Sequence, residues 1–176
     1  MADREPLESR TGEKLEYARI HLDELKREGS WDHGRHWVRA HEESVLDQVV
    51  GAKDAFLQEI NAAYGAGLQM HQVHEDRLLH RLGAGKSPEL DEIMRVSDPA
   101  NDWTWLALTL EIRNHGTHRA RPPVVYYEGG GAQSGTVRYR NPRDGTELNQ
   151  TIPEFLETAI DEMEALINRL RPTLPA

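Results

Sequence analysis

Apolar residues recur along the chain at a spacing that predicts helices over most of its length. In residues 13–28, leucine and alanine side chains return every three or four positions, which is the spacing of one helical face. Similar stripes cover residues 31–64 and residues 68–82. Residues 1–12 carry no such stripe, so we expect them to form a flexible lead-in.

Two glycines, Gly65 and Gly67, lie between the second and third stripes. Glycine inside a helix costs about 1 kcal/mol relative to alanine but does not forbid the helix. The pattern therefore leaves open whether residues 31–82 form two helices or one long bent helix. The segment GAGKSP then predicts a loop, and ELDEIMRV predicts a short helix.

The segment DPANDWTWLALTLEI predicts the most deeply buried helix. Asp98 is a suitable N-cap and Pro99 suits the first helical position. The apolar side chains that follow point in nearly every direction around the helix axis, which is typical of a helix enclosed by its neighbours. We expect this to be the central helix, and it would bring Arg113 to the edge of the core.

After Pro122 and Pro123 the pattern changes to short β-branched and aromatic runs, VVYYE and TVRYR, joined by a glycine-rich link. They predict a β-hairpin inserted at about residues 123–149, with a short third strand near Glu147. The last helix opens with TIPE, a capping box with proline in the first turn. The predicted fold class is all-α: a bundle of four to five helices with a β-hairpin before the last helix, in one domain over residues 13–176.

Composition limits the function. The chain has 176 residues, no cysteine and a net charge of −9. It has no apolar run long enough for a membrane span and a charged N-terminal segment, so we expect a cytoplasmic protein without a membrane partner. The charge is uneven, because residues 113–143 contain six arginines and one acid. A basic segment in an acidic chain indicates a local site for anions.

The sequence RNHGTH combines Arg113, Asn114 and His118 in the pattern R-N-x-x-x-H. This pattern resembles the motif of the HEPN superfamily, small helical bundles that occur in bacterial toxins, RNA-processing enzymes and antiviral systems. On an ideal helix Arg113 and His118 would lie about 140° apart, so they could converge only if the helix broke between them. Gly116 permits a break, and we therefore expect the helix to end or distort near Gly116.

The resemblance implies a metal-independent endoribonuclease that needs no cofactor. His118 would exchange a proton with the ribose 2′-hydroxyl or the leaving 5′-oxygen, and Arg113 would stabilise the phosphate, with Asn114 positioning it. The product would be a 2′,3′-cyclic phosphate. Basic and aromatic side chains nearby are candidates for binding the RNA or nucleotide: His115, Arg119, Arg121, Arg138, Arg140, Arg143, Tyr126, Tyr127 and Tyr139. The resemblance also implies a homodimer with a composite site and, for a toxin-like or defence role, an antitoxin partner.

Two alternatives stay open. The first is a HEPN-like module that binds a nucleotide or a protein partner without cleavage. The second is a metal-binding bundle, because His71 and His74 stand three residues apart and could share one metal ion with a third histidine if they faced inward from a helix.

Overall fold

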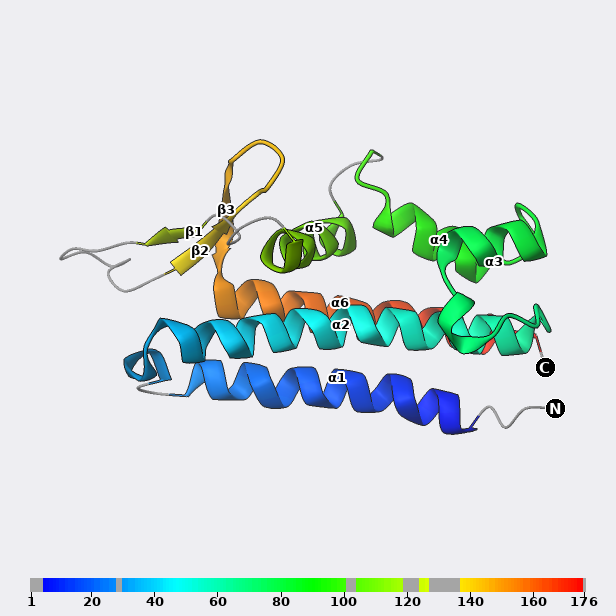
Figure 1. Cartoon of the computed structure of the whole chain (residues 1–176), viewed down its shortest axis with the longest axis horizontal. Helices are drawn as coiled ribbons and strands as arrows, with labels where there is room; N and C mark the ends of the chain where they lie inside the picture. The colour runs from blue at the N-terminus through cyan, green and yellow to red at the C-terminus, as the bar shows by residue number, and fades with distance from the viewer. Residues whose placement is uncertain (1–4, 28–29, 101–103, 119–123, 127–136, 176) are drawn as a thin grey trace.

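The computed structural model describes residues 5–27, 30–100, 104–118, 124–126 and 137–175. This part of the chain is mostly helical and carries a small antiparallel sheet (Figure 1). Its α-helices are α1 (Glu5–Lys26), α2 (Arg35–Ala63), α3 (Glu75–Leu82), α4 (Pro88–Ser97), α5 (Trp105–His118) and α6 (Ile152–Leu170). Its other elements are η1 (Ser30–His33), η2 (Met70–Gln72), η3 (Arg171–Thr173), β1 (Val124–Tyr126), β2 (Val137–Arg140) and β3 (Glu147–Thr151). The broad prediction is confirmed, although these residues form six α-helices rather than four or five.

The long helix α2, and not α5, occupies the centre of the molecule. It packs against α1, α4, α5 and α6, and Figure 1 shows α1 along one side of it and α5 on the opposite side. In α5, Leu106 and Ile112 are buried, but Leu108 and Leu110 are only half-buried. The prediction of a central α5 was wrong because apolar residues on all sides of a helix do not show how many of those sides are covered by neighbouring helices.

Helix α1 begins at Glu5, so the expected flexible lead-in over residues 1–12 is wrong for residues 5–12. The cause is a tertiary contact rather than a local apolar stripe. Thr11 is 1% exposed, and its hydroxyl donates a hydrogen bond of 2.6 Å to Glu59 on α2. Because a buried hydroxyl needs such a partner, this contact stabilises the first turns of the helix.

The question left open for residues 31–82 is answered by two α-helices, α2 and α3. Gly65 and Gly67 adopt φ values of 61° and 71°, a left-handed conformation that glycine reaches without steric cost and that ends α2. Asn61 fixes the turn, because its side-chain amide both donates to and accepts from the backbone of Leu68 at 3.0 Å.

The start predicted for α5 was also wrong. Asp98 is the C-cap residue of α4, and its carboxylate accepts a hydrogen bond from the backbone of Ala100. The N-terminal cap of α5 is Thr104, whose hydroxyl accepts a hydrogen bond from the backbone N–H of Ala107 and donates one to the carbonyl of Val96. Thr104 therefore caps one helix while it holds the end of the preceding one.

The inserted strands form an antiparallel sheet in the order β1-β2-β3, which confirms the third strand. Val137 and Tyr139 are buried, whereas Arg138 is half-buried and Arg140 exposed, so the sheet turns one face to the core. Strand β3 leads directly into α6 through the predicted capping box, in which Glu154 accepts hydrogen bonds of 2.8 Å from both the backbone and the hydroxyl of Thr151.

A buried carboxylate ties both ends of the chain to α2. Glu59 is 4% exposed and accepts two hydrogen bonds of 2.8 Å from Arg171, in addition to the one from Thr11. This geometry is bidentate, the arrangement in which arginine binds a carboxylate most strongly. The contact with Glu59 raises the pKa of Arg171.

We predict that Arg171→Ala lowers the free energy of unfolding by about 2–4 kcal/mol, because among the described residues it leaves the buried Glu59 carboxylate with Thr11 alone as its partner. Arg169→Ala is the matched control: its exposed side chain pairs with Glu92, and its loss should cost less than about 1 kcal/mol. Urea unfolding of both variants measures the difference, and equal effects would contradict a special role for Glu59.

Candidate functional site

The C-terminal half of α5 holds Arg113 against α2. The Nε of Arg113 donates a hydrogen bond of 2.9 Å to the Oδ1 of Asp47, and its Nη1 lies 3.4 Å from the amide oxygen of Asn114. The Arg113 side chain is 33% exposed and that of Asp47 is 55% exposed. The guanidinium therefore sits at the edge of the core, where a phosphate could reach it, and Asp47 helps to orient it.

Helix α5 does not break at Gly116. It continues to His118, two residues beyond Gly116, so the break expected between Arg113 and His118 is wrong. On an uninterrupted ideal helix, positions 113 and 118 lie about 140° apart around the axis. The side chain of His118 lies outside the described residues, as do Arg119 and Arg121. The described backbone therefore gives no support for a meeting of Arg113 and His118 within one chain.

Most of the other predicted binding residues are in or beside the sheet. Arg138 forms an ion pair of 3.0 Å with Glu147 on the neighbouring strand. Arg140 is exposed on the outer side of β2, and Tyr126 is paired with Val137 in the β1–β2 register. His115 is half-buried on α5, next to Asn114, which is exposed.

Tyr139 is not available for stacking on RNA. Its side chain is 1% exposed, and its ring packs edge-on against Phe155 with 5.5 Å between the ring centroids. Arg143 is exposed and donates a hydrogen bond of 3.0 Å to the carbonyl of Pro99, which ties the β2–β3 turn to the segment before α5. Tyr127 lies outside the described residues.

A second ionisable group in this region, Glu42 on α2, was not among the candidate residues predicted from the sequence. Burial, reinforced by the neighbouring Glu43 and opposed by Arg39, raises the pKa of Glu42 from 4.5 to about 7. The buried hydroxyl of Tyr139 lies within electrostatic reach of Glu42, and among the described residues it has no hydrogen-bond partner. Glu42 stands four residues after Val38 and four before Leu46, both buried, so an acid on the apolar stripe was the signal available in the sequence.

The histidines proposed as a metal site do not come together. His71 lies in η2, His74 precedes α3, and both are exposed, as is His80. Because the two do not share a helix, their spacing of three residues does not place them on one face. Within the part of the chain that the structure describes, no group of three or more histidine, aspartate or glutamate side chains could hold a metal ion. The described residues therefore give no support for a metal site built on His71 and His74.

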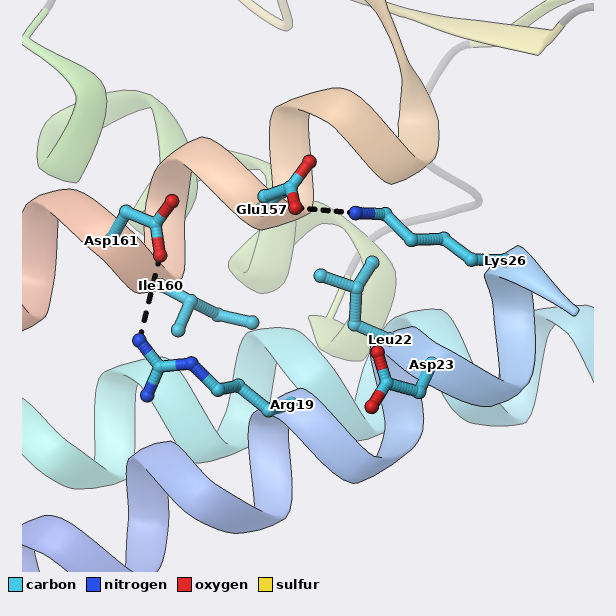
Figure 2. Close-up of a pocket in the computed structure, with 7 residues that line it drawn as sticks. All are labelled: Arg19, Leu22, Asp23, Lys26, Glu157, Ile160 and Asp161. Carbon is cyan, nitrogen blue, oxygen red and sulfur yellow. Dashed lines mark hydrogen bonds and ion pairs between the residues drawn. The ribbon is translucent and has the colours of Figure 1, made fainter.

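A hollow of about 100 Å³ lies between α1 and α6 (Figure 2). Ion pairs cross it, with Lys26 Nζ 2.5 Å from Glu157 and Arg19 3.5 Å from Asp161. None of its lining residues comes from α5 or the sheet, so it is separate from the motif. The hollow is too small for a nucleotide, and charged side chains that line it are already paired with one another across it.

Comparison of the chain with protein-family models, with curated proteins and with solved structures finds no match. Among the described helices, none is long and apolar enough to cross a membrane.

We predict that stability falls as pH rises from 5 to 8, and that Glu42→Gln removes part of this fall. Between the unfolded pKa near 4.5 and the folded pKa of about 7, the native state holds a proton that the unfolded chain has lost. Raising the pH through this window therefore favours unfolding, by at most about 3 kcal/mol. Urea unfolding at several pH values measures the slope.

Glu16→Gln serves as the control, because Glu16 is exposed on α1 and should leave the slope unchanged. If Glu42→Gln and the wild type lose stability in parallel between pH 5 and 8, the Glu42 carboxyl is not held in its neutral form.

Proposed function

We propose that the protein is a metal-independent endoribonuclease of HEPN type, with a toxin-like or defence role. The observation that supports this best is the position of the R-N-x-x-x-H motif. Helix α5 packs on α2 and α6 and carries Arg113 to the edge of the core, where Asp47 orients the guanidinium at 2.9 Å. A permanently charged, fixed donor at the protein surface is suited to a phosphodiester.

In the proposed reaction, the imidazole of His118 accepts the proton of a ribose 2′-hydroxyl while the 2′-oxygen forms a bond to phosphorus. The bond from phosphorus to the 5′-oxygen breaks, and the leaving oxygen takes up a proton from a second imidazole or from water. The product ends are a 2′,3′-cyclic phosphate and a 5′-hydroxyl. Arg113 stabilises the charge that develops on the phosphate oxygens, and no metal ion takes part.

The continuous α5 changes how the site would be assembled. Because positions 113 and 118 lie about 140° apart around an ideal helix axis, we propose that two chains pair across their α5 ends. Arg113 of one chain and His118 of its partner would then bind the same phosphate. A two-fold symmetric dimer would contain two such sites.

We predict that the purified protein cleaves single-stranded RNA in the presence of EDTA, and that Arg113→Ala and His118→Ala each lower the rate by about 100-fold or more. Arg77→Ala and His80→Ala, at exposed positions of α3, control for the loss of a cation or an imidazole and should retain full activity. Gel analysis and phosphatase treatment identify the cyclic phosphate. Cleavage by His118→Ala at the wild-type rate would overturn the assignment.

Mixing the two inactive variants tests the assembly across chains. If Arg113 and His118 act in trans, a mixed dimer holds one intact site, so an equimolar mixture should regain about a quarter of the wild-type rate. Size-exclusion chromatography with light scattering must first show that dimers form and exchange. A dimer that exchanges its chains without recovering activity would exclude the arrangement in trans.

The runner-up is a nucleotide- or partner-binding module without catalysis. The unbroken α5 favours it, because a binding site needs Arg113 at the surface but does not need His118 beside it. Absence of RNA products, combined with nucleotide binding that Arg113→Ala abolishes and Arg77→Ala preserves, would support this function instead.

A further inference from the structure

A pair of histidines joins the two longest helices at a distance that suits a shared ligand. His21 on α1 and His41 on α2 place their Nδ1 atoms 3.1 Å apart, with ring centroids separated by 5.1 Å and planes inclined by 65°. Both side chains are half-buried. The two nitrogens converge from two separate, packed helices and not from one flexible loop.

We propose that His21 and His41 form a binding site for a borderline divalent transition-metal ion such as Zn²⁺, with the two Nδ1 atoms as its protein ligands. Imidazole nitrogen binds Zn²⁺ at 2.0–2.1 Å. Two nitrogens 3.1 Å apart would then enclose an angle of about 98° at the metal, given those bond lengths. This lies between the right angle of square or octahedral coordination and the tetrahedral angle, so the distance between the two nitrogens suits one shared metal ion.

Neighbouring groups prepare the site. The indole of Trp37 packs against His41 with 4.2 Å between ring centroids, and His33 packs against the same indole at 4.8 Å. This contact limits the rotation of the His41 ring, as fixed metal ligands require. Burial, together with His41, lowers the pKa of His21, which favours the neutral imidazole that can donate a lone pair to a metal.

The site would be open rather than closed by protein. In the described part of the chain the pair has no third histidine or carboxylate that would complete a group of three, so water would fill the other coordination positions. Glu24 lies one turn along α1 from His21 and acts on it electrostatically, although its carboxylate binds Arg27 at 2.7 Å. Nitrogen ligands generally bind Cu²⁺ more tightly than Zn²⁺, so this site would also have the higher affinity for Cu²⁺.

The competing explanation for the 3.1 Å contact is a hydrogen bond between two neutral rings in opposite tautomers. Such a bond uses one proton, and it would make the pair a purely structural contact between α1 and α2. Metal binding would displace that proton and use the lone pairs of both nitrogens. The two explanations therefore differ in what happens when Zn²⁺ is added.

Titration of the full chain with ZnCl₂ by calorimetry tests the proposal. We expect one site that is weakened on the order of tenfold or more in His21→Ala and in His41→Ala, since the loss of mere supporting contacts to a metal ligand already has that effect. His36→Ala and His80→Ala remove exposed histidines and should leave this site intact. His21→Gln and His41→Gln, checked by circular dichroism, guard against loss of folding.

A second measurement does not depend on substitution. In ¹⁵N spectra of the histidine side chains, Zn²⁺ should shift the Nδ1 signals of His21 and His41 together, and those of His36 and His80 should not move with them. Zinc binding that is unchanged in all four variants at these two positions, or shifts confined to other histidines, would overturn the proposal and leave a hydrogen-bonded pair.

Discussion

The Glu59 carboxylate is the constraint on which the arrangement of the long helices depends. It is 4% exposed, and a charge this deeply buried is tolerated only with well-placed partners. Thr11 supplies one from α1, and Arg171 supplies two from the turn after α6. Any sliding of α1 or α6 along α2 would leave the carboxylate short of a partner. This one polar group therefore favours a single register of α1 and α6 against α2, in addition to the apolar packing between them.

Glu59 lies near the C-terminus of α2, and the N-terminal half of the same helix makes other interactions. A second set of ionisable groups lies there, with Arg39 paired to Glu43 on one turn and Asp47 paired to Arg113 of α5. Glu42 lies within electrostatic reach of Tyr139 of the sheet. The same helix therefore uses charge for packing near its C-terminus and displays charge to α5 and the sheet near its N-terminus. A rigid platform of this kind is what a surface-bound phosphate site requires.

The sequence predicted those elements whose signals are local. The Thr-x-x-Glu box and the apolar stripe located α6, and alternation located β2, because capping and side-chain periodicity depend on neighbours in the chain. The errors have a common cause in tertiary contacts. Asp98 and Thr104 are both suitable N-caps. Thr104 caps α5 in the structure, where its hydroxyl also donates a hydrogen bond to the carbonyl of Val96. Residues 5–12 are helical without a local apolar stripe, and the hydrogen bond from Thr11 to Glu59, 48 residues away, holds them against α2. The Asp47–Arg113 pair could not be predicted from the sequence for the same reason, because it joins residues that lie far apart in the chain.

The passage of α5 through Gly116 limits any mechanism that uses the motif. Glycine there costs about 1 kcal/mol relative to alanine, and the helix forms despite it. Bending the chain at Gly116 to bring His118 toward Arg113 would break backbone hydrogen bonds of the last turn, each worth about 1 kcal/mol net. Pairing two unbent helices from two chains avoids that loss. If the motif is catalytic, a site shared between chains is therefore the less costly solution, and a monomeric enzyme would be the more surprising one.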